Sequence, residues 1–287
     1  MKLGVSTYSL SRLIRSGEMS VLDVIEWIAE NGGEHVEIVP IGYELEGNDV
    51  LVQSICHKAA ETGLDISNYA IGAHFAVDDE DAFHKEIDRV KQHVDIAAAL
   101  GAKRMRHDVA SRPPAEATTA AFINELGRLA EACRQIADYA ASLGIVTSVE
   151  NHGYYIQASE RVQALIHTVN HPNFKTTLDI GNFWCADEWP IVGVRRNLPI
   201  ASMVHLKDFY RRGADRHPGE GWFRSAGGDY LRGAIVGQGD IDMPQIIRVI
   251  KQSGYDGYIS IEFEGHEDPR FGTKAGLDNA RRIWNEV

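Results

Sequence analysis

Four side chains in the second half of the chain are of types that bind metal ions and transfer protons. Glu150, Asp179 and Glu262 are carboxylic acids and His205 carries an imidazole, and each follows a run rich in β-branched and apolar residues. Successive members are separated by about one, one and two repeats of ~30 residues, the length of one strand and helix unit. Carboxylate oxygens together with one imidazole suit Mn²⁺, Mg²⁺, Co²⁺ or Zn²⁺. The set therefore predicts a site for one divalent metal ion.

Each of these residues also has an ordinary structural interpretation. An acid at the end of a strand is often a surface charge or a helix cap, and His205 alone is equally well explained as a buried, hydrogen-bonded histidine. The four together are harder to explain in this way. Residues two apart on a strand share a face, and three acids in phase on neighbouring strands would repel one another unless a cation lies among them. The metal site is therefore the preferred interpretation.

The stretch IVTSVENHG, residues 145–153, indicates how such a side chain is positioned. Ile, Val, Thr and Val favour a strand, and the polar triplet with Glu150 followed by Gly153 marks its exit into a loop. Similar runs recur along the chain, and strands are predicted at 3–9, 35–40, 65–71, 103–109, 145–150, 174–180, 200–209 and 258–263.

Helical patterns separate these strands. They are predicted at 20–31, 49–62, 78–100, 118–143, 159–169, 191–197 and 243–253. Gly33, Gly63, Gly101 and Gly144 lie where a helix gives way to a strand. This alternation predicts an α/β fold, a (β/α)8 TIM barrel that forms a single domain over residues 1–287, with its active site at the carboxyl ends of the strands.

One segment breaks the alternation after the seventh strand. Residues 210–239 are rich in Gly, Arg and aromatic residues. We expect an extended loop over the active site, because a loop of this length is usually functional or mobile.

Composition excludes some classes of partner. The formal net charge is −12 and the sequence pI is about 5.4, which repels nucleic acid and anionic lipid. The first residues lack the apolar core of a signal peptide, and no run approaches the ~20 apolar residues of a membrane span. The three cysteines are odd in number and lie far apart in the sequence, which suggests that they are reduced thiols. We expect a cytoplasmic protein that binds neither nucleic acid nor membrane.

The motifs around the four residues resemble a known superfamily. VEN, LDIGN and HLKD contain Glu150, Asp179 and His205, and GQGDID is followed by GYDGYISIEFEG, which contains Glu262. Over essentially the whole chain, this set resembles the xylose-isomerase-like TIM barrel superfamily of sugar phosphate isomerases and epimerases. That superfamily includes ketose 3-epimerases, inosose dehydratase, dehydroshikimate dehydratase and endonuclease IV. The resemblance implies that the four residues bind one divalent metal ion and that the two glutamates also act as acid and base.

Three further positions bear on the resemblance to ketose 3-epimerases. Arg211 matches a substrate-contacting arginine of those enzymes. Two positions depart from their pattern, because Asn182 stands where they carry histidine and Ile156 where they carry a further glutamate. These departures disfavour a simple free-ketose 3-epimerase.

Other residues are predicted to contact a substrate. His152 and His107 lie at strand exits, Lys207 shares a face with His205, and Trp184 could stack on a sugar ring. The structural alternatives are ordinary loop residues for the two histidines and simple packing for the tryptophan. For Arg211, the alternative is part of a solvated basic patch.

The leading hypothesis is a metal-dependent isomerase or epimerase of a sugar or keto-sugar derivative. It would remove a proton next to a carbonyl and stabilise the enediolate with the metal ion, for which manganese is one choice. The alternative is a dehydratase or lyase that expels a leaving group from the same carbanion. An abasic-site endonuclease and a non-catalytic sugar-binding subunit are less favoured. The expected partner is a small carbohydrate, and a homo-oligomer is compatible with the sequence.

Overall fold

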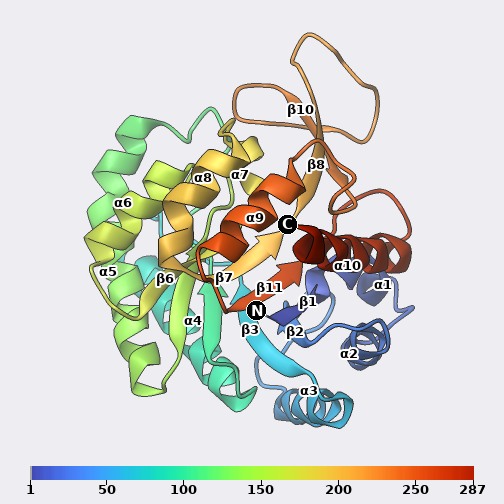
Figure 1. Ribbon diagram of the computed structural model, residues 1–287. Coiled ribbons are helices and arrows are strands. Elements are labelled where there is room, and N and C mark those ends of the chain that lie inside the picture. The colour runs from blue at the N-terminus through green and yellow to red at the C-terminus, as the bar shows by residue number, and fades with distance from the viewer. Residues whose placement is uncertain (1) are drawn as a thin grey trace.

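The eight predicted strands form a closed parallel barrel in the computed structural model, which describes residues 2–287 (Figure 1). Strands that follow one another along the chain pair side by side, and the ring closes where Lys2 on the first strand lies opposite Tyr258 on the last. The predicted (β/α)8 fold is confirmed. In barrel order from the N-terminus, the strands are β1 (Lys2–Ser6), β2 (His35–Ile38), β3 (Asp65–Ile71), β4 (Arg104–His107), β5 (Val146–Glu150), β6 (Phe174–Asp179), β7 (Ala201–Leu206) and β11 (Tyr258–Ile261).

Helices surround this barrel and bury their apolar faces against the strands (Figure 1). In α2, for example, Ser20 caps the first turn in a capping box with Asp23, and Val24 and Ile28 are fully buried. No helix within residues 2–287 is both long and apolar enough to cross a membrane. The helices are η1 (Thr7–Leu10), α1 (Ser11–Arg15), α2 (Val21–Glu30), α3 (Asp49–Thr62), α4 (Glu80–Ala99), α5 (Thr119–Ser142), α6 (Ser159–Val169), α7 (Asn182–Cys185), α8 (Pro190–Asn197), η2 (Leu198–Ile200), α9 (Met243–Gln252) and α10 (Pro269–Glu286).

The segment expected to be a long loop contains three short strands. Strands β8 (Asp208–Arg212), β9 (Phe223–Arg224) and β10 (Tyr230–Ala234) form a separate three-stranded antiparallel sheet. Figure 1 shows β8 and β10 extending beyond the barrel. Residues 210–239 thus form the expected long excursion after the seventh barrel strand, and about two thirds of them lie outside the strands of this sheet.

Asp208 ties this sheet to the barrel. Its buried carboxylate accepts hydrogen bonds from the backbone N–H groups of Phe209 (2.8 Å), Gly237 (2.9 Å), Gly239 (3.0 Å) and Ile241 (3.3 Å). Charge-assisted bonds of this kind are stronger than neutral ones. The HLKD and GQGDID motifs are therefore joined physically, which fixes where β8 begins and where β10 leads back into α9.

Candidate functional site

The four predicted metal ligands converge at the carboxyl end of the barrel. Glu150 ends β5, Asp179 ends β6, His205 lies near the end of β7, and Glu262 directly follows β11. Each offers one ligand atom, and these atoms all lie within 4.8 Å of one another. All four residues are buried, and Asp179 and His205 are adjacent in the register of β6 and β7. A buried group of three carboxylates and one imidazole could bind one metal ion.

The imidazole of His205 is oriented by a second carboxylate. Its Nε2 atom lies 2.9 Å from Glu37 Oε2, and Asn68 donates to Glu37 Oε1 at 2.7 Å. The other nitrogen, Nδ1, has no hydrogen-bond partner within residues 2–287. It faces oxygens of Glu262 at 3.5 Å, Asp179 at 3.8 Å and Glu150 at 3.9 Å. A histidine held in this way by a carboxylate presents its free nitrogen to a metal ion.

Lys207 supplies positive charge beside the cluster. Its Nζ atom lies 2.6 Å from Glu262 Oε2, 3.2 Å from Asp179 Oδ2 and 3.5 Å from Glu264 Oε2. The ammonium also lies over the ring of Tyr8, 5.7 Å from its centroid. Because Lys207 is itself buried, its ammonium replaces solvent as the partner of these carboxylates.

The charges shift the pKa values of the cluster in different directions. Burial raises the pKa of Asp179 to about 7, although Lys207 opposes that shift. Burial would also raise the pKa of Glu262, but Lys207 and His205 outweigh it and lower the value to about 2. Burial would lower the pKa of His205, but Glu37 and Glu262 raise it to about 10. The positive charges of Lys207 and His205 thus stabilise the carboxylate of Glu262, whereas burial outweighs them at Asp179.

Glu150 is fixed by two neighbours, one from strand β4 and one from helix α7. Arg106 on β4 places Nη2 2.8 Å from Glu150 Oε2, and Asn182 donates from Nδ2 to Glu150 Oε1 at 3.0 Å. The Asn182 backbone N–H donates to Asp179 Oδ1 at 2.8 Å. Asn182 therefore connects two of the candidate ligands, and it occupies the position where the resemblance leads one to expect histidine.

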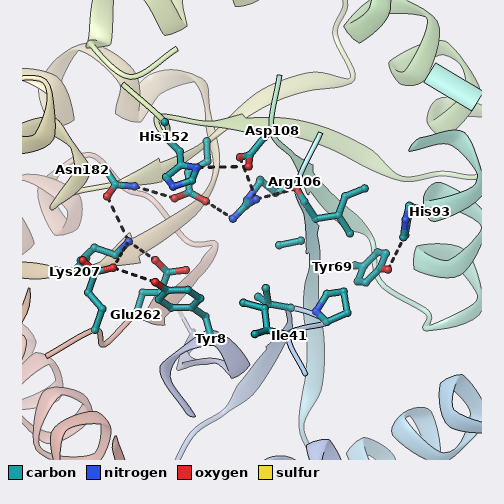
Figure 2. Close-up of a pocket in the computed structure, with 18 of the residues that line it drawn as sticks. Tyr8, Ile41, Tyr69, His93, Arg106, Asp108, His152, Asn182, Lys207 and Glu262 are labelled. Atoms are coloured by element: carbon teal, nitrogen blue, oxygen red, sulfur yellow. Dashed lines mark hydrogen bonds and ion pairs between the residues drawn. The ribbon is translucent and has the colours of Figure 1, made fainter. Parts of the chain in front are cut away.

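A cavity of about 610 Å³ opens above this cluster. Glu150, Glu262 and Lys207 line it, as does His152, whose side chain is half exposed and lies 3.5 Å from Asp108 Oδ2. Figure 2 shows His152, Asp108 and Arg106 along one side of this space. The structure thus brings together the candidate metal ligands and two of the five predicted substrate-contacting residues.

The other three predicted contact residues lie outside the cavity lining. His107 is fully buried between Phe75 and Phe174, because alternation along β4 turns it away from the barrel interior. Arg211 pairs with Asp229 at 2.6 Å, and Trp184 is buried 5.7 Å below its guanidinium. The substrate contacts expected of His107, Arg211 and Trp184 do not fit this arrangement.

Several residues around the candidate ligands were not among the predicted site residues. Glu37 and Asn68 are fully buried beside His205, and Arg106 is buried against Glu150. The sequence feature that could have identified them is a charged residue inside an otherwise apolar strand, such as Glu37 in HVEIVP. Such a residue must face a partner when the strand is buried on both faces.

Curated relatives of this chain include enzymes named for sugar-related reactions. A human protein named putative hydroxypyruvate isomerase is 24% identical over 204 residues, which cover 68% of this chain and 65% of that protein. An inosose dehydratase of Lacticaseibacillus casei is 26% identical over 147 residues, or 51% of this chain and 49% of that protein. The chain thus spans about half to two thirds of the length of these relatives.

Solved structures show the same fold at low sequence identity. A probable 3-DHS dehydratase from Bacillus anthracis has a TM-score of 0.75 at 19% identity, covering 97% of this chain and 98% of that one. A D-psicose 3-epimerase from Clostridium cellulolyticum H10, solved with D-tagatose, has a TM-score of 0.75 at 16% identity and 99% coverage of both chains. A Mycobacterium smegmatis xylose isomerase-like TIM barrel protein in complex with magnesium has a TM-score of 0.69 at 20% identity, covering 92% and 87%.

The family model described as xylose isomerase-like TIM barrel matches residues 25–283, most of the length of the chain. The matched region contains seven of the eight barrel strands and all four residues of the candidate metal cluster. The protein therefore belongs to the xylose isomerase-like TIM barrel family.

Proposed function

We propose that this protein is a metal-dependent isomerase or epimerase of a sugar or keto-sugar derivative. It removes a proton from carbon next to a carbonyl and passes through an enediolate. The observation that supports this most directly is the buried group of Glu150, Asp179, His205 and Glu262 at the base of a cavity of about 610 Å³. The names of the isomerase, epimerase and dehydratase relatives agree with this class of chemistry.

The residues of the cluster fit a divalent cation. His205 Nδ1 is buried without a hydrogen-bond partner in the described chain and faces three carboxylates within 3.9 Å. The four residues would hold the ion, with Glu37 orienting the histidine. When bound, such an ion supplies Lewis-acid charge for the oxygens on which negative charge develops.

Glu150 and Glu262 are the proposed acid and base. They come from β5 and the end of β11, which are separated in the barrel by β6 and β7, so they reach the cavity from different directions. Each is held in position, Glu150 by Arg106 and Asn182 and Glu262 by Lys207. One carboxylate can take the proton from one face of the substrate while the other returns a proton to the opposite face, which is what an epimerisation requires.

Lys207 and His152 are the proposed contacts for substrate oxygens. Both line the cavity, Lys207 beside Glu262 and His152 on the rim beside Asp108. Donors in a site closed to water stabilise developing negative charge more strongly than they would in solvent. The ammonium of Lys207 is therefore well placed to stabilise an enediolate oxygen.

A dehydratase or lyase is the second candidate. The inosose dehydratase from L. casei and the probable 3-DHS dehydratase structure support it. The same carbanion would expel a group on the next carbon, provided that an acid can protonate the leaving oxygen. His152, half exposed at the rim of the cavity, is the residue placed to do so.

The substitution Glu150→Gln tests the proposed role in proton transfer. The amide keeps the shape of the side chain and cannot accept the proton, so exchange of substrate carbon-bound hydrogen with D₂O should fall by at least about 100-fold. Three metal ligands remain, and most of the bound metal should be retained in elemental analysis. Glu30→Gln, on the exposed end of α2, is the matched control. If Glu150→Gln exchanges substrate hydrogen with D₂O near the wild-type rate, Glu150 does not transfer the proton.

A further inference from the structure

The cavity continues well beyond the metal cluster. Its lining includes residues of the β2 to α3 connection, of β3 and of α4, on the side of the barrel away from β6 and β7. Figure 2 shows Tyr69 and His93 across the open space from Lys207 and Asn182, with Ile41 between them along the lower wall. We refer to this part as the second compartment, lined by Pro40, Ile41, Glu46, Tyr69, Arg89 and His93.

The far wall of the second compartment is held in place by polar contacts of its own. Tyr69 Oη lies 2.8 Å from His93 Nδ1, and His93 Nε2 lies 2.6 Å from Glu46 Oε1. Arg89 is fixed by two bonds to Glu86, each 2.9 Å, and by one to the carbonyl of Gly72 at 2.7 Å. A wall fixed in this way loses little conformational freedom when a ligand binds.

The second compartment is lined by both apolar and charged side chains. Pro40 and Ile41 offer apolar, partly exposed surfaces. The side chains of Glu46 and Arg89 are 55% and 34% exposed, so their polar groups remain accessible beside those surfaces. A sugar ring has apolar C–H faces and a hydroxyl edge. Apolar surface flanked by a few oriented polar groups is the arrangement that binds such a ring.

The volume of the cavity also exceeds what one sugar unit needs. About 610 Å³ holds roughly 20 water molecules at ~30 Å³ each. A hexose has twelve non-hydrogen atoms and a disaccharide twenty-three. At one non-hydrogen atom per water molecule, a single hexose at the metal cluster would leave roughly eight of these 20 positions, about 40% of the cavity, filled with water.

We propose that the second compartment binds a second sugar unit, so that the substrate is a glycosidically linked pair of rings. The carbonyl-bearing unit lies at Glu150 and Glu262, and the second unit lies against Ile41 with its hydroxyls on Glu46 and Arg89. This inference rests on the proposed function for the position of the first unit. It adds a substrate class, because it assigns to the far half of the cavity the binding of a linked sugar.

The test compares the magnesium-loaded enzyme with D-fructose and with four disaccharides that carry a free fructose unit: turanose, maltulose, leucrose and isomaltulose. They join glucose to different fructose oxygens and so sample the directions in which a second ring can project. Calorimetric titration measures binding, and hydrogen exchange with D₂O measures proton removal. At least one disaccharide should bind the wild-type protein about tenfold or more tightly than D-fructose.

Ile41→Trp should abolish that preference while leaving D-fructose binding within about twofold, because the larger side chain fills the second compartment and not the metal site. Val50→Trp is the matched control, since Val50 is 76% exposed on α3 and lies outside the cavity. Glu46→Gln tests the same compartment with a change of no bulk, and it should reduce the preference about fivefold or more. Thermal unfolding shows that each variant is folded.

The outcomes separate the two proposals. If no disaccharide binds more tightly than D-fructose, the second compartment is not a sugar site. The same conclusion follows if Ile41→Trp and Val50→Trp bind the preferred disaccharide equally tightly. If the disaccharide preference and its loss are found but no sugar exchanges hydrogen, the compartment stands and the proposed isomerase or epimerase activity fails.

Discussion

His205 Nε2 lies 2.9 Å from Glu37 Oε2, and neither side chain is exposed to solvent. The two residues come from β7 and β2, which are not neighbours in the barrel. Glu37 thereby fixes which nitrogen of His205 faces the three carboxylates. In metal sites, this arrangement orients the imidazole and raises its basicity as a ligand.

Replacing Glu37 should therefore weaken metal binding without removing a ligand. In Glu37→Gln we expect the affinity for Mn²⁺ to fall by about 10- to 100-fold, because the histidine loses its orienting charge. Titration calorimetry on chelator-treated protein measures this directly. Glu30→Gln, at an exposed position, should bind as the wild type does. An unchanged Mn²⁺ affinity in Glu37→Gln would show that Glu37 does not support the site.

Lys207 contacts the same carboxylates that would bind a metal ion. Removal of one partner of a buried ion pair costs about 3–5 kcal/mol when the remaining charge is left unpaired. Lys207→Met should therefore lower the free energy of unfolding in the presence of a chelator. Added Mg²⁺ should recover more stability in this variant than in the wild type, since the ion replaces the lost positive charge.

Urea unfolding with chelator and with Mg²⁺ measures the two differences. Lys85→Met, an exposed substitution on α4, is the matched control and should behave as the wild type does. Equal stabilisation of Lys207→Met and wild type by Mg²⁺ would mean that the ion does not bind among the carboxylates that Lys207 contacts.

Two buried histidines predict a loss of stability in weak acid. Burial lowers the pKa of both His35 and His107 to about 4. In the unfolded chain a histidine takes up its proton near pH ~6.5, so the unfolded state gains protons first as the pH falls. Above pH ~6.5 both histidines are neutral in the folded and the unfolded state, so their burial does not lower the free energy of unfolding. Between about pH 6.5 and 4 the free energy of unfolding falls by up to about 3 kcal/mol for each residue.

The variant His35→Gln isolates one of these contributions. Glutamine can still donate to the carbonyl of Ile259, which His35 Nε2 contacts at 3.0 Å, but it cannot titrate. The free energy of unfolding should therefore decrease less steeply with falling pH than in the wild type. Identical slopes for His35→Gln and wild type would contradict the assignment.

The strands and the metal ligands could be predicted from the sequence because both depend on local patterns. All eight barrel strands follow from short apolar runs, four of them after Gly33, Gly63, Gly101 or Gly144, and Glu150 and Asp179 lie at the visible ends of such runs. Helix α10 was not predicted, because its buried face consists largely of small residues such as Gly272 and Gly276, which pack against Phe263 and Val236 and give little hydrophobic signal. A pattern of apolar spacing cannot detect a face of this kind.

The residues around the ligands could not be found in this way. Glu37 and Arg106 act on residues far away in the sequence, and only the closure and register of the barrel bring them to His205 and Glu150. His107, in contrast, was predicted to contact a substrate but lies outside the cavity lining. It adjoins Arg106, and strict alternation along β4 already requires that the two side chains point in opposite directions.

Hydrogen exchange with and without metal tests the central claim most directly. The purified protein is treated with a chelator and divided, and one half is supplied with Mg²⁺ or Mn²⁺. Both halves are then incubated in D₂O with the panel of keto-sugars and keto-disaccharides. We expect deuterium to enter carbon next to the carbonyl of at least one sugar only in the metal-supplied half. Exchange at the same rate in both halves would contradict a metal-dependent proton transfer at Glu150, Asp179, His205 and Glu262.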